Sequence, residues 1–159
     1  MDVLCNITLD VPGQYAILHC LEAWYNMSFW LFMDYVTDDH RSPAIEWYGT
    51  LDEDVQAAFD LLVKNLSETE DWDEPKPRKR KYKELRREHE GLCELFLIWG
   101  TRSFRPIGIL HREIREFIFL GGCEKLGKDV TDPKGAFDSA LRFKQQFDAR
   151  RGIIREYFF

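Results

Sequence analysis

Three apolar segments in the middle of the sequence, residues 92–99, 104–111 and 116–120, limit most strongly what this chain can fold into. Each has the length and composition of a β-strand, and only short turns such as Gly100-Thr101-Arg102-Ser103 separate them. Neighbouring strands that are joined by such short turns run antiparallel. The sequence therefore predicts a three-stranded antiparallel meander.

Helical patterns lie on both sides of this meander. Residues 30–37 have strand composition, Ser42-Pro43 is a helix start, and residues 50–66 carry apolar side chains at helical spacing. A last helix opens at Asp132-Pro133. The order predicts an α+β fold: a small antiparallel sheet, made of one N-terminal strand and the meander, with two helices packed on one face and a C-terminal helix. We expect one domain over residues 30–150, an extension without clear periodicity over residues 1–29, and a tail over residues 151–159.

The charge of the chain is divided unevenly between its two halves. The net charge is −6, but residues 1–74 hold 2 basic against 16 acidic side chains, and residues 75–159 hold 20 basic against 12 acidic ones. Such an asymmetry indicates a basic surface for an anionic partner. The alternative is that the acidic half only neutralises the basic half within one fold.

Several classes of protein are excluded by what the sequence lacks. It has no run of eighteen apolar residues, which predicts no membrane span, and its acidic start is unlike a signal peptide. Its cysteines (Cys5, Cys20, Cys93 and Cys123) show no C-x-x-C spacing, so we expect free thiols in a reducing cytoplasm and no metal site. Motifs of nucleotide-binding proteins, zinc peptidases and hydrolases are missing, and no cofactor is expected.

The order of these segments resembles that of the RelE/HigB superfamily of type II toxins, especially its phage-derived branch. Five short motifs carry the resemblance over about residues 30–147: SP..EW...L from Ser42, GLCEL from Gly91, FR at Phe104, FLGGCEK from Phe119, and DP with a later A..F from Asp132. The resemblance implies a RelE-like fold and a metal-independent endoribonuclease that cleaves messenger RNA on the ribosome. It also implies a cytoplasmic location and, as partners, a small helix-turn-helix antitoxin, messenger RNA and the ribosome.

Four residues are candidates for this chemistry, in which a ribose 2′-hydroxyl attacks the adjacent phosphate. An arginine stays protonated and its fork matches two phosphate oxygens, so Arg105 is expected to contact the scissile phosphate. Its alternative role is a cross-strand ion pair with Glu94. Pro106 cannot donate to a ladder and predicts a bulge, or a missing neighbour, at this point. Lys125 matches a family lysine, and Glu94 and His111 are candidate proton acceptors, each with a purely structural alternative.

A dense basic run follows the acidic segment at residues 67–77. It predicts RNA binding through counterion release, independent of base sequence, with a solvated loop as the alternative. Tyr82 offers a ring for base stacking. Arg102 in the hairpin turn is a candidate contact to a flanking phosphate, or an exposed turn residue. The RNA-binding candidates are Arg78, Lys79, Arg80, Lys81, Tyr82, Lys83, Arg86, Arg87 and Arg102.

The sequence also departs from the family pattern. Phe96 stands where many members have an arginine, Gly121 replaces a histidine, and Leu126 replaces the second of two lysines. These departures favour a second hypothesis, since a fold alone does not decide function. In it, the chain is a non-catalytic RelE/ParE-like binder, either a degenerate toxin or a gyrase-targeting protein, that binds an antitoxin-like partner.

Overall fold

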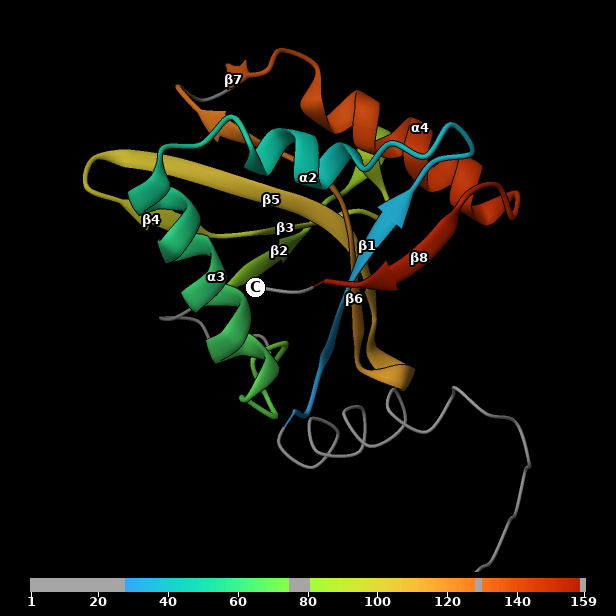
Figure 1. The fold of residues 1–159 in the computed structure, drawn as a ribbon, viewed down its shortest axis with the longest axis horizontal. Coiled ribbons are helices and arrows are strands. Elements are labelled where there is room, and N and C mark those ends of the chain that lie inside the picture. The colour runs from blue at the N-terminus through green and yellow to red at the C-terminus, as the bar shows by residue number, and fades with distance from the viewer. Residues whose placement is uncertain (1–27, 75–80, 128–129, 158–159) are drawn as a thin grey trace, which may run out of the picture.

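The computed structural model describes residues 28–74, 81–127 and 130–157 of the chain. Within these residues there are three α-helices, α2 (Pro43–Tyr48), α3 (Glu53–Ser67) and α4 (Ala136–Asp148), and two short 3₁₀ helices, η1 (Arg87–His89) and η2 (Arg112–Ile114). The strands are β1 (Leu31–Val36), β2 (Tyr82–Glu84), β3 (Cys93–Leu95), β4 (Leu97–Trp99), β5 (Arg102–His111), β6 (Glu116–Lys125), β7 (Thr131–Asp132) and β8 (Ile153–Glu156). Figure 1 shows their arrangement.

All eight strands belong to one mixed sheet. Its order is β2-β3-β5-β6-β1-β8, with β4 paired to β5 and β7 paired to β6. Strand β1 runs parallel to β6, whereas β3, β5 and β6 pair antiparallel in succession. The predicted small antiparallel sheet of four strands is therefore wrong, both in its size and in its strand directions.

The predicted helices and central strands are present, and the helices lie on opposite faces of the sheet. Helices α2 and α3 cover one face, where Val55, Phe59 and Val63 of α3 pack against the aromatic side chains of the sheet. Helix α4 covers the other face through Ala136 and Ala140. The sheet is thus the middle layer, and apolar spacing along α3 predicted its buried side correctly.

The turn into α2 has the expected chemistry. The Ser42 side chain accepts a hydrogen bond from the Ile45 N–H at 3.1 Å, and Pro43 occupies the first turn, where its missing N–H costs nothing. Helix α3 begins at Glu53, with acidic side chains in its first turn.

The β5 strand carries a local irregularity on each of its edges. Its register with β6 shifts between Ile107 and Gly108, and a side chain at Gly108 would collide with the Ile118 carbonyl and the Phe117 ring. On the other edge, the chain leaves the ladder at Phe96, between β3 and β4, so neither strand pairs with Arg105 or Pro106. The prediction of a missing neighbour beside Pro106 is confirmed, while the bulge itself lies two residues further on.

The end of the chain is part of the same sheet. Strand β8 pairs antiparallel with β1, and Tyr157 is buried against Phe59 and Phe119 of the α2–α3 core. Residues 153–157 therefore extend the domain and do not form a separate tail. The predicted extension over residues 1–29 lies outside the described residues except for its last two, of which Phe29 donates its N–H to the Ser67 carbonyl.

Candidate functional site

An open groove of about 1800 Å³ lies on the α4 face of the sheet. Strand β2 and η1 form one wall, and Lys125, residues 130–135 and the first turn of α4 contribute to the other. Glu94 of β3 contributes to its floor. Because successive side chains of a strand point to opposite faces, Glu94 faces α4, while Cys93 and Leu95 are buried in the α2–α3 core. We call this hollow the β2–α4 groove.

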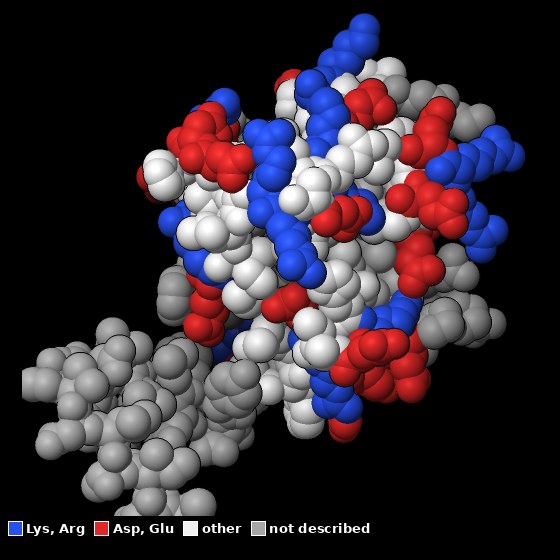
Figure 2. All heavy atoms as spheres, turned by 90° about the vertical axis from the view of Figure 1, so that its right-hand side faces the viewer, with Lys and Arg blue, Asp and Glu red and all other residues white. Residues whose placement is uncertain are grey.

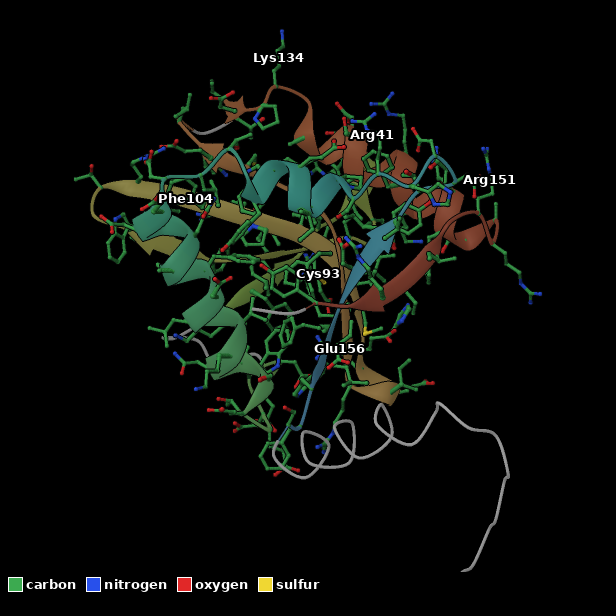
Figure 3. All side chains as sticks on the ribbon, viewed as in Figure 1. Arg41, Cys93, Phe104, Lys134, Arg151 and Glu156 are labelled. Atoms are coloured by element: carbon green, nitrogen blue, oxygen red, sulfur yellow. The ribbon has the colours of Figure 1, made fainter. Side chains whose placement is uncertain are left out.

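Among the side chains of the β2–α4 groove that form no ion pair with a described residue, the basic ones outnumber the acidic ones. Two of its acidic side chains are held in ion pairs, Glu84 by Arg112 and Glu94 by Arg105, and Asp138 contacts the imidazole of His89. Glu88 and Glu90 have no ion pair with a described residue. The cations of the groove that make no ion pair with any described residue are Arg86, Arg87, Lys125 and Lys134. Lys134 extends away from the body of the protein in Figure 3.

Arg105 is held by its neighbours in the sheet and does not project into the groove. Its side chain is only 14% exposed, and its Nε lies 3.4 Å from Oε2 of Glu94, whose side chain is 4% exposed. The guanidinium lies 4.7 Å from the centre of the Phe96 ring and donates to the Phe104 carbonyl at 2.9 Å. The ion pair with Glu94, predicted as the alternative, is confirmed. In this arrangement, the expected contact between Arg105 and a phosphate is blocked.

The Glu94–Arg105 pair is close but poorly satisfied. Glu94 Oε2 and Arg105 Nε are both buried, and neither makes a hydrogen bond with a described residue. The nearest other cation is Lys83, whose Nζ lies 3.7 Å from Glu94 Oε1. Two buried charges that depend on one another in this way are costly to separate, because each would remain unpaired.

Three of the four predicted catalytic residues are close enough to one buried cysteine, Cys123, for their charges to affect the pKa of its thiol. The pKa of the Cys123 thiol is raised to about 12, mainly by burial and to a smaller extent by the charge of Glu94, and the charges of Arg105 and Lys125 oppose this rise. Burial likewise raises the pKa of Cys93 to about 12, so both thiols stay protonated at neutral pH. Both are free, as predicted, while Cys5 and Cys20 lie outside the described residues.

His111 does not join this group. It ends β5, six residues beyond Arg105, which is about 20 Å along an extended strand. Its Nδ1 lies 3.2 Å from Oε2 of Glu116, and its ring packs on Phe147 of α4. The structure therefore gives His111 a local partner outside the β2–α4 groove, and its predicted role as the proton acceptor is not supported.

The predicted RNA-binding residues separate into several groups. Lys83, Arg86 and Arg87 line the β2–α4 groove, and Lys81 is exposed immediately before β2. Tyr82 is 8% exposed, packs on Trp72, and donates its hydroxyl to the Asp73 carbonyl at 2.6 Å. Its expected stacking on a base is therefore excluded in this conformation. The remaining members of the run, Arg78, Lys79 and Arg80, lie outside the described residues.

Arg102 is occupied by two carboxylates. It bonds Asp52 at 2.5 Å, holds Glu124 through Nε and Nη2 at 3.0 and 2.8 Å, and covers the Phe104 ring at 4.8 Å. The hydrogen bonds from Arg102 hold the pKa of the Glu124 carboxyl below its usual value. A phosphate would have to displace both acids, so the expected phosphate contact is not supported by this geometry.

One pair in the groove was not among the predicted site residues. The imidazole of His89 in η1 lies 2.9 Å from the carboxylate of Asp138 in the first turn of α4. The two residues are 49 positions apart, and no sequence motif joins them. Only the packing of η1 on α4 brings them together.

The surface beyond the groove is of mixed charge. Figure 2 shows the side on which α4 and β8 lie, where positive and negative side chains are interspersed. Among the described residues, no cluster of three His, Cys, Asp or Glu side chains is arranged to hold a metal ion. Among those same residues, none of the helices combines the length and the apolar character that a membrane crossing needs.

Comparisons with protein-family models, with curated proteins and with solved structures gave no significant match to this chain.

Proposed function

We propose that this protein binds RNA along the β2–α4 groove, as the toxin component of a type II toxin–antitoxin pair, and that it is an endoribonuclease without a metal ion. The observation that supports binding most is the set of four groove cations without an acidic partner among the described residues: Arg86, Arg87, Lys125 and Lys134. Cations that no carboxylate neutralises are available to phosphates, and each phosphate contact releases counterions.

The toxin assignment comes from the motifs of the sequence. In this proposal the protein acts in the cytoplasm on ribosome-bound messenger RNA, and a small helix-turn-helix antitoxin keeps it silent. Induced expression in bacteria tests it: growth should arrest, transcripts should be cleaved, and co-expression of the antitoxin should restore growth. If growth arrests while the transcripts stay intact, the proposed endoribonuclease activity would be contradicted.

A second candidate function is a non-catalytic binder on the same surface. The Glu94–Arg105 pair favours it, because the guanidinium that the resemblance assigns to the scissile phosphate is already neutralised by a carboxylate. Such a protein would bind RNA, or an antitoxin-like partner, without cleaving a strand. If the protein binds a labelled RNA and no cleavage product forms, the result would support the non-catalytic binder.

Binding along the groove should depend steeply on salt. For single strands, log K falls with log salt by about 0.7 for each phosphate contacted, so Lys125→Ala should reduce this slope by roughly 0.7. The measurement is fluorescence anisotropy of a labelled single-stranded RNA between 50 and 200 mM salt. The control is Arg41→Ala, since Arg41 is paired with Glu46 and does not line the groove. If Lys125→Ala left the slope of log K against log salt unchanged, the RNA would bind outside the β2–α4 groove.

A further inference from the structure

His89 is oriented by two contacts from α4. Its Nε2 lies 2.9 Å from Oδ1 of Asp138, and its ring packs on Phe137 with the centroids 5.7 Å apart. An ionised carboxylate can only accept hydrogen bonds, so Nε2 carries the proton in this contact. In the neutral imidazole the lone pair is then on Nδ1, which is the form that can accept a proton.

The backbone around His89 is shaped to hold this position. Arg87 has φ 61° and Gly91 has φ 84°, so left-handed residues stand on both sides of the histidine. Glycine adopts this conformation at no steric cost, whereas a residue with a side chain, such as Arg87, adopts it rarely. At Gly91 a Cβ atom would also lie 2.8 Å from Cε of Lys144, so η1 approaches α4 closely. This close approach is what brings His89 to Asp138.

The His89 side chain is 22% exposed and lines the β2–α4 groove together with Lys125, Arg86 and Arg87. Its Nδ1 makes no hydrogen bond with any described residue. We propose that His89 is the general base for RNA cleavage in this groove and that Asp138 is its positioning residue. This inference rests on the proposed function and names the proton acceptor that the sequence could not identify.

The reaction is a transesterification within the RNA strand. The ribose 2′-oxygen forms a bond to the adjacent phosphorus and gives its proton to Nδ1 of His89. The bond between phosphorus and the 5′-oxygen breaks, and the 5′-oxygen takes a proton from water. The products are a 2′,3′-cyclic phosphate and a 5′-hydroxyl end, and the imidazolium returns its proton to solvent. Cations of the groove such as Lys125 stabilise the extra negative charge on the phosphorane.

The other candidate bases lack this combination of access and orientation. Glu94 is buried and paired with Arg105, so taking a proton would leave the charge of Arg105 without its carboxylate partner. His111 has a carboxylate partner of its own but does not line the groove. Among the three, only His89 is both oriented by an acid and open to the groove.

The test measures binding and cleavage separately, with a 5′-labelled messenger RNA that is either free or bound to ribosomes. His89→Ala should retain RNA affinity within about twofold and lose cleavage by about a hundredfold or more. Added imidazole should restore part of the lost rate, which a merely structural histidine would not show. Asp138→Ala should lower kcat with KM unchanged, and Asp138→Glu should recover part of it. The matched control is His111→Ala, which removes a histidine that is also paired with an acid and packed on an aromatic ring.

Each outcome is decisive. Cleavage by His89→Ala at the wild-type rate, or a loss that imidazole does not restore, would overturn the assignment of His89. Wild-type protein that binds RNA without cleaving it would overturn this inference and leave RNA binding intact. Failure of the wild type to bind RNA in either form would overturn the proposed function itself.

Discussion

Replacing Arg105 by alanine is expected to lower the free energy of unfolding by about 3 kcal/mol, because it leaves the Glu94 carboxylate buried without its closest cation. Among the described residues, only Lys83, at 3.7 Å and half exposed, would still form an ion pair with Glu94. The loss of stability should appear in urea or thermal unfolding followed by circular dichroism.

The double variant Arg105→Leu with Glu94→Leu separates a structural from a functional arginine. Buried ion pairs contribute little net stability compared with apolar side chains of similar size, so the double variant should recover the wild-type stability or exceed it. Arg102→Ala is the matched control, since it removes an exposed arginine from the same strand, and its stability should equal that of the wild type within error. An Arg105→Ala protein that unfolds like the wild type but no longer cleaves RNA would restore Arg105 to the catalytic role that its motif implied.

Elements with a strong pattern of their own were predictable from the sequence, and short edge strands were not. Helix α3 repeats its apolar side chains at helical spacing, and β5 contains the apolar run of residues 106–110. Strand β2 has only three residues and lies within a charged run. Strand β8 shows no alternation of apolar and polar residues that would distinguish it from a solvated tail. Their pairing comes from the backbone and from Tyr82 and Tyr157, each of which is buried by elements distant in the sequence.

The site shows the same division. The Glu94–Arg105 pair was within reach of the sequence, because a short hairpin sets the register of the strands that carry it. The contact of His89 with Asp138 was not, because it depends on how η1 meets the first turn of α4 across the sheet edge. Charge density predicted a basic surface, but only coordinates distinguish Arg102, which two acids occupy, from Arg86 and Arg87, which remain available in the groove.

The second large effect is expected at Arg155, which holds the last strand to the core. The Asp34 side chain is 1% exposed and forms an ion pair with Arg155, whose Nη2 lies 2.9 Å from Oδ2 of Asp34. It accepts hydrogen bonds from Arg155 Nε at 3.0 Å and from Ser42 Oγ at 2.5 Å. Ser42 is also the residue that caps α2. One buried carboxylate therefore links β1, α2 and β8.

Arg155→Ala should lower the free energy of unfolding by about 3 kcal/mol, because Asp34 would stay buried with Ser42 as its only remaining side-chain donor among the described residues. Hydrogen exchange should also become faster in β8, whose pairing with β1 loses its side-chain tie. The control is Arg151→Ala, which breaks an ion pair with Asp38 just before β8, but at a site where both side chains are more than half exposed. Figure 3 shows Arg151 at the edge of the protein, where water can replace its partner. If the two variants lost the same stability, burial of Asp34 would not be what makes the β8 connection strong, and the end of the chain would be held by Tyr157 and the β1–β8 ladder instead.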